Sequence, residues 1–173
     1  MNKLVVLAGV PGSGKSYFSK TLQKVKTSHT YIVSSDDIRK QICGIQTDLS
    51  EDELVWKIFV GLAKVYSQDK NGVVVLDATH ISTYLRVDRN KELKQLFDQL
   101  FLVVWSGNKD LVMNQNLQRE FPLPPEAMEM FFANFEPVGE KEKEFFDKII
   151  EVKDNNIAAA IEAIDVGDTF KLF

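Results

Sequence analysis

The glycine-rich segment at residues 9–16 limits what this chain can fold into more than any other part of its sequence. Its residues, GVPGSGKS, fit the pattern G-x-x-x-x-G-K-[ST] and directly follow the apolar run of residues 4–8. The pattern is typical of a loop between a buried strand and a helix, in which successive backbone N–H groups point at one anion. Phe18, Leu22 and Val25 then follow at helix spacing, so both flanking elements are of the required type.

The polar residues of this loop indicate a nucleoside triphosphate and a metal ion as ligands. We assign nucleotide binding to Gly12, Ser13, Gly14, Lys15 and Ser16. Lys15 would place an ammonium group on the β- and γ-phosphates, and the Ser16 hydroxyl is a hard oxygen ligand suited to Mg²⁺. The following helix directs its positive end at the same phosphates. The alternative, a chance turn, matches this pattern in well under about 1% of chains of this length.

Short apolar runs alternate with helical patterns along the whole chain. The strand candidates are residues 4–8, 31–33, 73–76, 102–105 and 145–152. Helices are expected at residues 16–26, 36–42, 83–97, 110–119, 126–135 and 156–164, and between a capping box at residues 50–53 and the Asn71-Gly72 stop. This order predicts an α/β protein, a three-layer α/β/α sandwich with a parallel sheet of about five strands. We expect one domain over residues 1–173, with a lid at about 110–136.

Composition excludes several classes of protein. The 173 residues carry a net charge of −4, which excludes a protein that coats nucleic acid by bulk charge alone. One cysteine, Cys43, and two histidines make neither an internal disulfide nor a Cys/His zinc site. The apolar runs are too short for a membrane span or a signal peptide, so we expect a cytoplasmic protein without a membrane partner.

Asp36 and Arg39 follow the second strand candidate and share one face of the expected helix, because they are three residues apart. This pair suits phosphoryl transfer: the carboxylate accepts the proton of an acceptor hydroxyl, and the arginine holds an anionic group of the acceptor. Asp37 lies further round the helix and is expected to matter less. The alternative is a helix cap with a surface ion pair.

Asp77 closes the third strand candidate, where an acid can hold the hydration shell of Mg²⁺ or orient a substrate group. Thr79 is a candidate contact to an acceptor oxygen. His80 is either a second acceptor contact or a loop histidine without a binding role. Ligands of parallel sheets sit at the carboxyl ends of the strands, so we expect these residues beside the glycine-rich loop.

Arg119 precedes the proline-rich residues 122–125. A mobile segment that carries an arginine can close over a triphosphate, stabilise charge in the transition state and exclude water. The alternative is an exposed arginine that faces the carboxyl end of a helix. The phenylalanines between Phe131 and Phe146 stand at helix spacing and are expected in the core rather than as a platform for stacking bases.

Together these residues resemble those of P-loop kinases of the polynucleotide 5′-hydroxyl kinase group and of the wider zeta-toxin-like set of small ATP-dependent kinases. The matching pieces are residues 9–16, Asp36-Asp37-Ile38-Arg39, Asp77-Ala78-Thr79-His80, Arg119 and Phe135-Glu136-Pro137. The resemblance implies the P-loop NTPase fold with a helical lid, Asp36 as general base on a 5′-hydroxyl, Arg39 on the acceptor phosphate, Asp77 as an essential acid and Arg119 as the lid arginine. The chain departs from the family at Gln115, where an arginine is usual, and at His80, where asparagine is common.

We therefore predict an ATP-dependent kinase that transfers the γ-phosphoryl group to a hydroxyl, with Lys15, Asp36 and Arg119 catalytic and Ser16 and Asp77 holding Mg²⁺. The preferred acceptor is a 5′-hydroxyl end of DNA or RNA. One alternative is a kinase for a nucleoside, nucleotide, sugar or antibiotic, which the acidic net charge and Gln115 favour. The other is a nucleotide-switch ATPase with no acceptor, in which Asp36 and Arg39 would have no role.

Overall fold

A five-stranded sheet forms the centre of the computed structural model, which describes residues 1–26 and 29–169. The strands are β1 (Lys3–Ala8), β2 (Thr30–Ser34), β3 (Val73–Asp77), β4 (Gln99–Trp105) and β5 (Lys148–Val152). They lie in the order β2-β3-β1-β4-β5, and every neighbouring pair is parallel. The predicted parallel sheet is confirmed.

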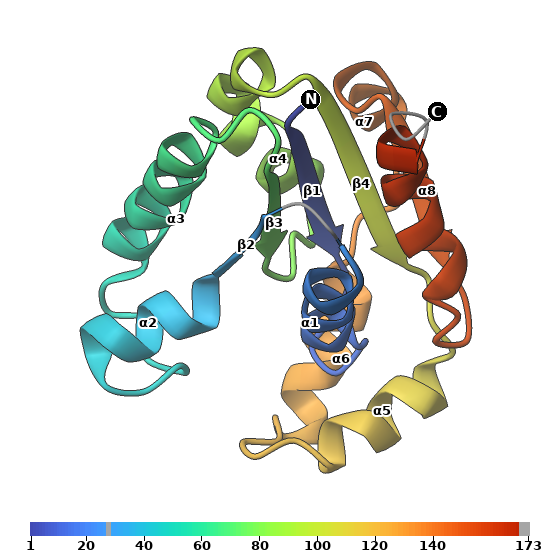
Figure 1. Ribbon diagram of the computed structural model, residues 1–173. Helices are drawn as coiled ribbons and strands as arrows, with labels where there is room; N and C mark the ends of the chain where they lie inside the picture. The colour runs from blue at the N-terminus through green and yellow to red at the C-terminus, as the bar shows by residue number, and fades with distance from the viewer. Residues whose placement is uncertain (27–28, 170–173) are drawn as a thin grey trace.

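Helices cover both faces of this sheet, as expected for a three-layer sandwich (Figure 1). They are α1 (Lys15–Val25), α2 (Ser35–Cys43), α3 (Asp52–Tyr66), α4 (Thr83–Arg86), the 3₁₀ helix η1 (Asp88–Leu96), α5 (Lys109–Leu117), α6 (Pro125–Asn134), α7 (Glu140–Phe145) and α8 (Ala158–Thr169). Helices α1 and α8 pack on one face, whereas α3, η1 and α7 pack on the other. Helices α5 and α6 extend beyond the carboxyl ends of the strands (Figure 1).

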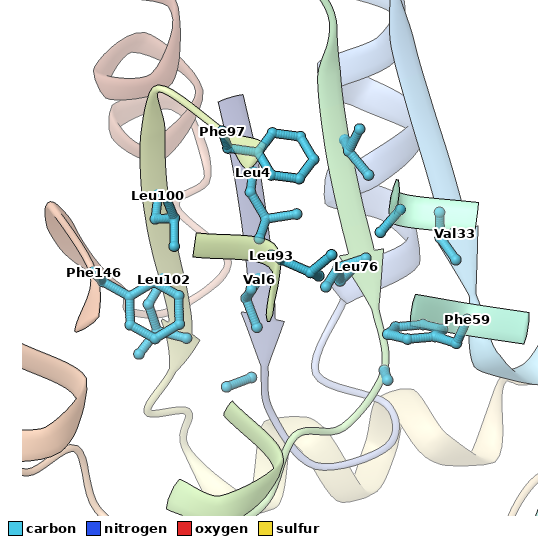
Figure 2. Packing of buried hydrophobic residues seen from close by; sticks show 14 of the residues in the cluster. Leu4, Val6, Val33, Phe59, Leu76, Leu93, Phe97, Leu100, Leu102 and Phe146 are labelled. Atoms are coloured by element: carbon cyan, nitrogen blue, oxygen red, sulfur yellow. The ribbon is translucent and has the colours of Figure 1, made fainter. Parts of the chain in front are cut away.

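The central strands are apolar on both sides because both sides are buried. Leu4 and Val6 of β1 face the α3 side, where they share a cluster with Phe59 (Figure 2). Val5 faces the other side and packs in a cluster with Phe18 of α1. Side chains alternate across a strand, so the continuous apolar run contributes to two separate cores. This arrangement fixes the start of the glycine-rich loop at the carboxyl end of the central strand β1.

Helix spacing predicts an apolar face with Leu54, Ile58 and Leu62, and α3 differs from the prediction both at its start and in the face that it buries. The predicted capping box is wrong: the residue before the helix is Glu51, and no side chain caps the first turn. The buried residues are Val55, Phe59 and Ala63, whereas Leu54 is 43% exposed. Adjacent positions of this helix are both apolar, so its pattern fits two faces, and the sheet buries the one that carries the aromatic Phe59.

The single helix predicted for residues 83–97 is wrong. The chain forms one turn of α4 and then continues as the 3₁₀ helix η1. The buried Asn90 side chain donates hydrogen bonds to the carbonyls of Leu85, at 3.1 Å, and Arg86, at 3.3 Å. An uninterrupted α-helix would use these carbonyls for its own backbone hydrogen bonds.

The carboxyl-terminal elements also begin later than predicted. Phe145 ends helix α7, which the sequence pattern did not indicate, and β5 begins only at Lys148. Phe145 and Phe146 are both buried in the core, as expected for the apolar residues of this region. The last helix begins at Ala158 rather than at residue 156.

Within the ranges that the structure describes, none of the helices combines the length and the apolar character needed to cross a lipid bilayer.

Candidate phosphoryl-transfer site

The glycine-rich loop joins β1 to α1 and presses against α5. Gly12 and Gly14 have φ angles of +85° and +103°, in the left-handed region that glycine adopts without strain. A Cβ at Gly12 would lie 3.2 Å from the backbone nitrogen of Asn116. Ser13 is buried and bonds back to the carbonyl of Val10, at 3.2 Å through its N–H and at 2.5 Å through its hydroxyl. Ser13 therefore shapes the loop.

Lys15 lies inside this loop as a buried cation. Its Nζ donates hydrogen bonds to the carbonyls of Gly9, at 2.8 Å, and Val10, at 2.9 Å. The pKa of Lys15 is lowered to about 8, mainly by burial and also by the positive charge of Arg119, while the negative charge of Asp77 acts in the opposite direction. The ammonium group therefore lacks sufficient negative charge around it, and a phosphate group would supply that charge.

Ser16 and Asp77 place two oxygen atoms beside Lys15. The Ser16 hydroxyl at the start of α1 donates a 2.9 Å hydrogen bond to Oδ2 of Asp77 at the end of β3. Burial raises the pKa of Asp77, and the charge of Lys15 counteracts this rise. A hydroxyl and a carboxylate are ligands that Mg²⁺ accepts. No group of three or more acidic, histidine or cysteine side chains could hold a metal among the described residues, so phosphates and water must complete such a site.

On the other side of the loop, α2 presents Asp36 and Arg39. Ser34 caps this helix by accepting a 3.2 Å hydrogen bond from the N–H of Asp37. One terminal nitrogen of Arg39 lies 3.3 Å from Oδ1 of Asp36, which confirms the expected pairing three residues apart. The other lies 2.8 Å from Oδ1 of Asp52, at the start of α3. No sequence pattern pointed to a role for Asp52, since the residues around it indicated only a helix start.

Arg119 follows α5 and keeps a buried nitrogen, NH1, without a hydrogen-bond partner among the described residues. Oε1 of the neighbouring Gln115 is also buried and has no hydrogen-bond partner among these residues. Asn116 fixes the loop that connects Arg119 to α6. Its Nδ2 donates a 2.8 Å hydrogen bond to the carbonyl of Leu123, and its Oδ1 accepts a 3.0 Å hydrogen bond from the N–H of Leu123. Buried donors without partners are costly, so this geometry favours an anion beside Arg119.

One cavity of about 1000 Å³ brings most of the predicted residues together. Those that line it are Gly12, Gly14, Lys15, Ser16, Asp36, Asp37, Arg39, Asp77, Thr79, Gln115 and Arg119. Trp56 of α3 and Phe131 of α6 also line it. Phe131 was expected in the core, and no sequence pattern pointed to Trp56. The carboxyl ends of β1, β2 and β3 therefore meet at one site, as expected for a parallel sheet.

His80 does not line this cavity, so the expected contact with an acceptor is not met. Its ring is 1% exposed, and Nδ1 lies 2.6 Å from the carbonyl oxygen of Leu7. The ring centre lies 6.2 Å from that of Trp56 and 5.9 Å from that of Phe59. Burial lowers the pKa of His80 to about 4, so the ring is a neutral part of the core beneath the site.

The comparisons with known proteins agree with this fold. A family model described as an AAA domain (AAA_33) matches residues 4–137. A gluconokinase from Sinorhizobium meliloti 1021 is 17% identical, with a TM-score of 0.61, over 98% of this chain and 97% of that chain. Kti12 of Chaetomium thermophilum, in complex with ADP-AlF3, is 12% identical with a TM-score of 0.70, over 96% and 97%. The APS kinase CysC of Mycobacterium tuberculosis, in complex with AMPPNP and APS, is 16% identical with a TM-score of 0.66, over 96% and 98%. The chain has the P-loop NTPase fold that these proteins share.

Proposed function

Since this chain belongs to the AAA_33 family of AAA domains, we propose that it is a kinase that transfers the γ-phosphoryl group of ATP to a hydroxyl group. The observation that carries the proposal is the charge pattern of the cavity. Lys15 and Arg119 are cations without a matching carboxylate at hydrogen-bond distance in the described chain, and the acid Asp36 lines the same cavity. A triphosphate tail fits between such groups, with its outermost phosphate toward the acid.

The nucleotide would be held by the glycine-rich loop. Lys15 would exchange its bonds to the Gly9 and Val10 carbonyls for bonds to phosphate oxygens. Ser16 would bind Mg²⁺ directly, and Asp77 would hold it directly or through water. When bound, Mg²⁺ neutralises part of the charge that develops on the phosphates.

Asp36 would serve as the general base. As the acceptor oxygen forms its bond to the γ-phosphorus, the bond from that phosphorus to the bridging oxygen of ADP breaks, and the hydroxyl proton passes to Asp36. Arg39 keeps the Asp36 carboxylate in place through their 3.3 Å contact. Thr79 lines the same cavity and would contact the acceptor oxygen.

Arg119 would stabilise charge in the transition state from the opposite side. Its unpaired NH1 and the Gln115 amide lie on the segment of α5 and α6, which we propose as the lid. Exclusion of water by this segment would protect ATP from hydrolysis. The nucleotide-switch alternative is disfavoured, because it assigns no task to Asp36.

For the acceptor, a small molecule is the better candidate. A gluconokinase and an APS kinase are among the structures that share the fold and nearly the full length of the chain. The 5′-hydroxyl end of a polynucleotide remains the second candidate, because the residues from Asp36 to Arg39 carry that resemblance. Transfer to an oligonucleotide would weaken steeply as the salt concentration rises, whereas transfer to an uncharged small molecule would not.

The test is an assay of labelled phosphate transfer from ATP to a panel of hydroxyl compounds and a 5′-hydroxyl oligonucleotide. Asp36→Asn should lower transfer about 10²–10⁴-fold, because a general base contributes about that much, while ATP binding stays nearly intact. Asp37→Asn, the same change at the next residue, should retain most of the activity. Retention of more than about a tenth of the activity by Asp36→Asn would exclude it as the base.

A further inference from the structure

Arg39 is held between two carboxylates, and this contact bears on the charge of the acceptor. We propose that the acceptor is a polyhydroxy compound with no negative charge near its reacting hydroxyl, such as a neutral or amino-substituted sugar. The inference rests on the proposed kinase function and narrows its substrate class. It reverses the expectation that Arg39 holds an anionic group of the acceptor.

Both terminal nitrogens of the Arg39 guanidinium already bond carboxylates. A carboxylate or phosphate is bound best by two parallel N–H donors of one guanidinium. In Arg39, one terminal nitrogen bonds Asp36 at 3.3 Å and the other bonds Asp52 at 2.8 Å. Only Nε has no hydrogen-bond partner among the described residues. Two of the five N–H groups of the guanidinium therefore already bond carboxylates, one on each terminal nitrogen, and an entering anion would have to compete with both carboxylates for Arg39.

Asp52 is held in this position by a second contact. Its other carboxylate oxygen, Oδ2, accepts a 3.1 Å hydrogen bond from Nε1 of Trp56. The Trp56 ring is itself fixed, because Arg89 stacks over it at 4.5 Å and Phe59 packs edge-on at 4.9 Å. The Trp56 bond therefore holds the Asp52 carboxylate beside Arg39, and release of Arg39 to an anion would break the 2.8 Å Arg39–Asp52 bond.

The balance of charge at this end of the cavity is negative. One guanidinium faces two carboxylates, so an entering phosphate would meet an excess of like charge. The Arg39 side chain is 8% exposed, whereas those of Asp36 and Asp52 are 49% and 44% exposed, so water screens part of the charge of the two carboxylates. Trp56 lines the cavity and adds aromatic surface, as in sites for small organic ligands.

Inorganic sulfate tests the inference without a known acceptor. The protein is first saturated with Mg²⁺ and AMPPNP, which occupy the glycine-rich loop, and sulfate binding is then measured by calorimetry at constant ionic strength. The wild type should show no millimolar sulfate site, whereas Asp52→Asn should bind sulfate about tenfold more tightly or better, because one of the two negative charges beside Arg39 is removed. The control Glu53→Gln removes the same charge from a side chain that is 88% exposed and should behave as the wild type. Sulfate binding by the wild type as tight as that by Asp52→Asn would overturn the inference, and the wild-type titration decides even if Asp52→Asn does not fold.

A charge-matched series of acceptors separates this inference from the kinase proposal. Glucosamine, glucose and glucose 6-phosphate, with adenosine and AMP as a second series, are assayed for transfer from ATP. The cationic and neutral members should be phosphorylated at least about tenfold faster than the anionic ones. Faster transfer to an anionic member would overturn the inference and leave the kinase proposal standing. An ATP-binding protein that phosphorylates no member of either series would count against both.

Discussion

Removal of the Glu142 carboxylate should destabilise the fold strongly. Glu142 and Arg86 are both fully buried, and Oε1 of Glu142 lies 3.1 Å from NH1 of Arg86. The same oxygen accepts a 2.7 Å hydrogen bond from Thr83, and Arg86 also donates to the carbonyl of His80 at 2.7 Å. This network joins α7 to the loop that follows Asp77, so it supports the floor of the site.

The size of the effect follows from the charge that would be left behind. Loss of one partner of a buried ion pair leaves an uncompensated charge in the interior and costs about 3–5 kcal/mol. Glu142→Ala should therefore lower the free energy of unfolding by about this amount, a large part of the stability of a typical domain. The double variant Arg86→Met/Glu142→Leu should lose much less, because no charge stays buried.

Urea unfolding followed by circular dichroism measures these differences, provided that the slope of the transition is unchanged. Glu140→Gln is the matched control, since its carboxylate is 83% exposed and contacts only Lys143 at 3.2 Å among the ion pairs of the described chain. This control should change the free energy of unfolding by less than about 0.5 kcal/mol. If Glu142→Ala lowers the free energy of unfolding by less than about 1 kcal/mol, the Arg86–Glu142 pair is not desolvated and the predicted destabilisation is wrong.

Two further predictions concern the core beneath the site and the glycine-rich loop. Burial lowers the pKa of His80 from 6.5 to about 4. Between about pH 6.5 and pH 4, His80 is therefore protonated in the unfolded chain and neutral in the folded protein. Stability should be complete above about pH 6.5 and fall by about 2 kcal/mol towards pH 5, and unfolding curves of His80→Asn should lack this slope; an equal slope in both proteins would contradict the assignment. Gly12→Ala should weaken ATP binding about tenfold or more in calorimetry, because φ is +85° and the new Cβ would lie 3.2 Å from backbone atoms of α5. In contrast, Gly61→Ala in α3, where nothing lies within 4 Å, should bind ATP as the wild type does.

The sequence predicted the sheet and the phosphate loop because the signals for both are local. The apolar run of β1 and the GVPGSGKS segment are contiguous, and each of their residues acts through its own backbone or its immediate neighbours. The Asp36–Arg39 pair was equally accessible, since residues three apart meet on any helix. These features do not depend on how distant parts of the chain pack.

The errors arose where a distant residue decides the local structure. Asp52 reaches Arg39 only because α2 and α3 pack together, and no spacing rule relates residues 13 positions apart. Glu142 and its helix α7 are fixed by Arg86, which lies 56 positions earlier. His80 is drawn into the core by Trp56, Phe59 and the carbonyl of Leu7, and none of these contacts is visible in the order of residues.

In the proposed kinase, the glycine-rich loop presents the outermost phosphate of ATP to Asp36 of α2. A crystal structure of the wild-type protein with Mg²⁺ and AMPPNP would show this directly. The γ-phosphate should lie between Lys15 and Arg119, with Ser16 on the metal. An acceptor oxygen should fit between the γ-phosphorus and Asp36, at a distance of about 3–3.5 Å from the phosphorus, as the reaction requires. A γ-phosphate directed away from Asp36, or a nucleotide bound outside the loop of residues 9–16, would contradict it.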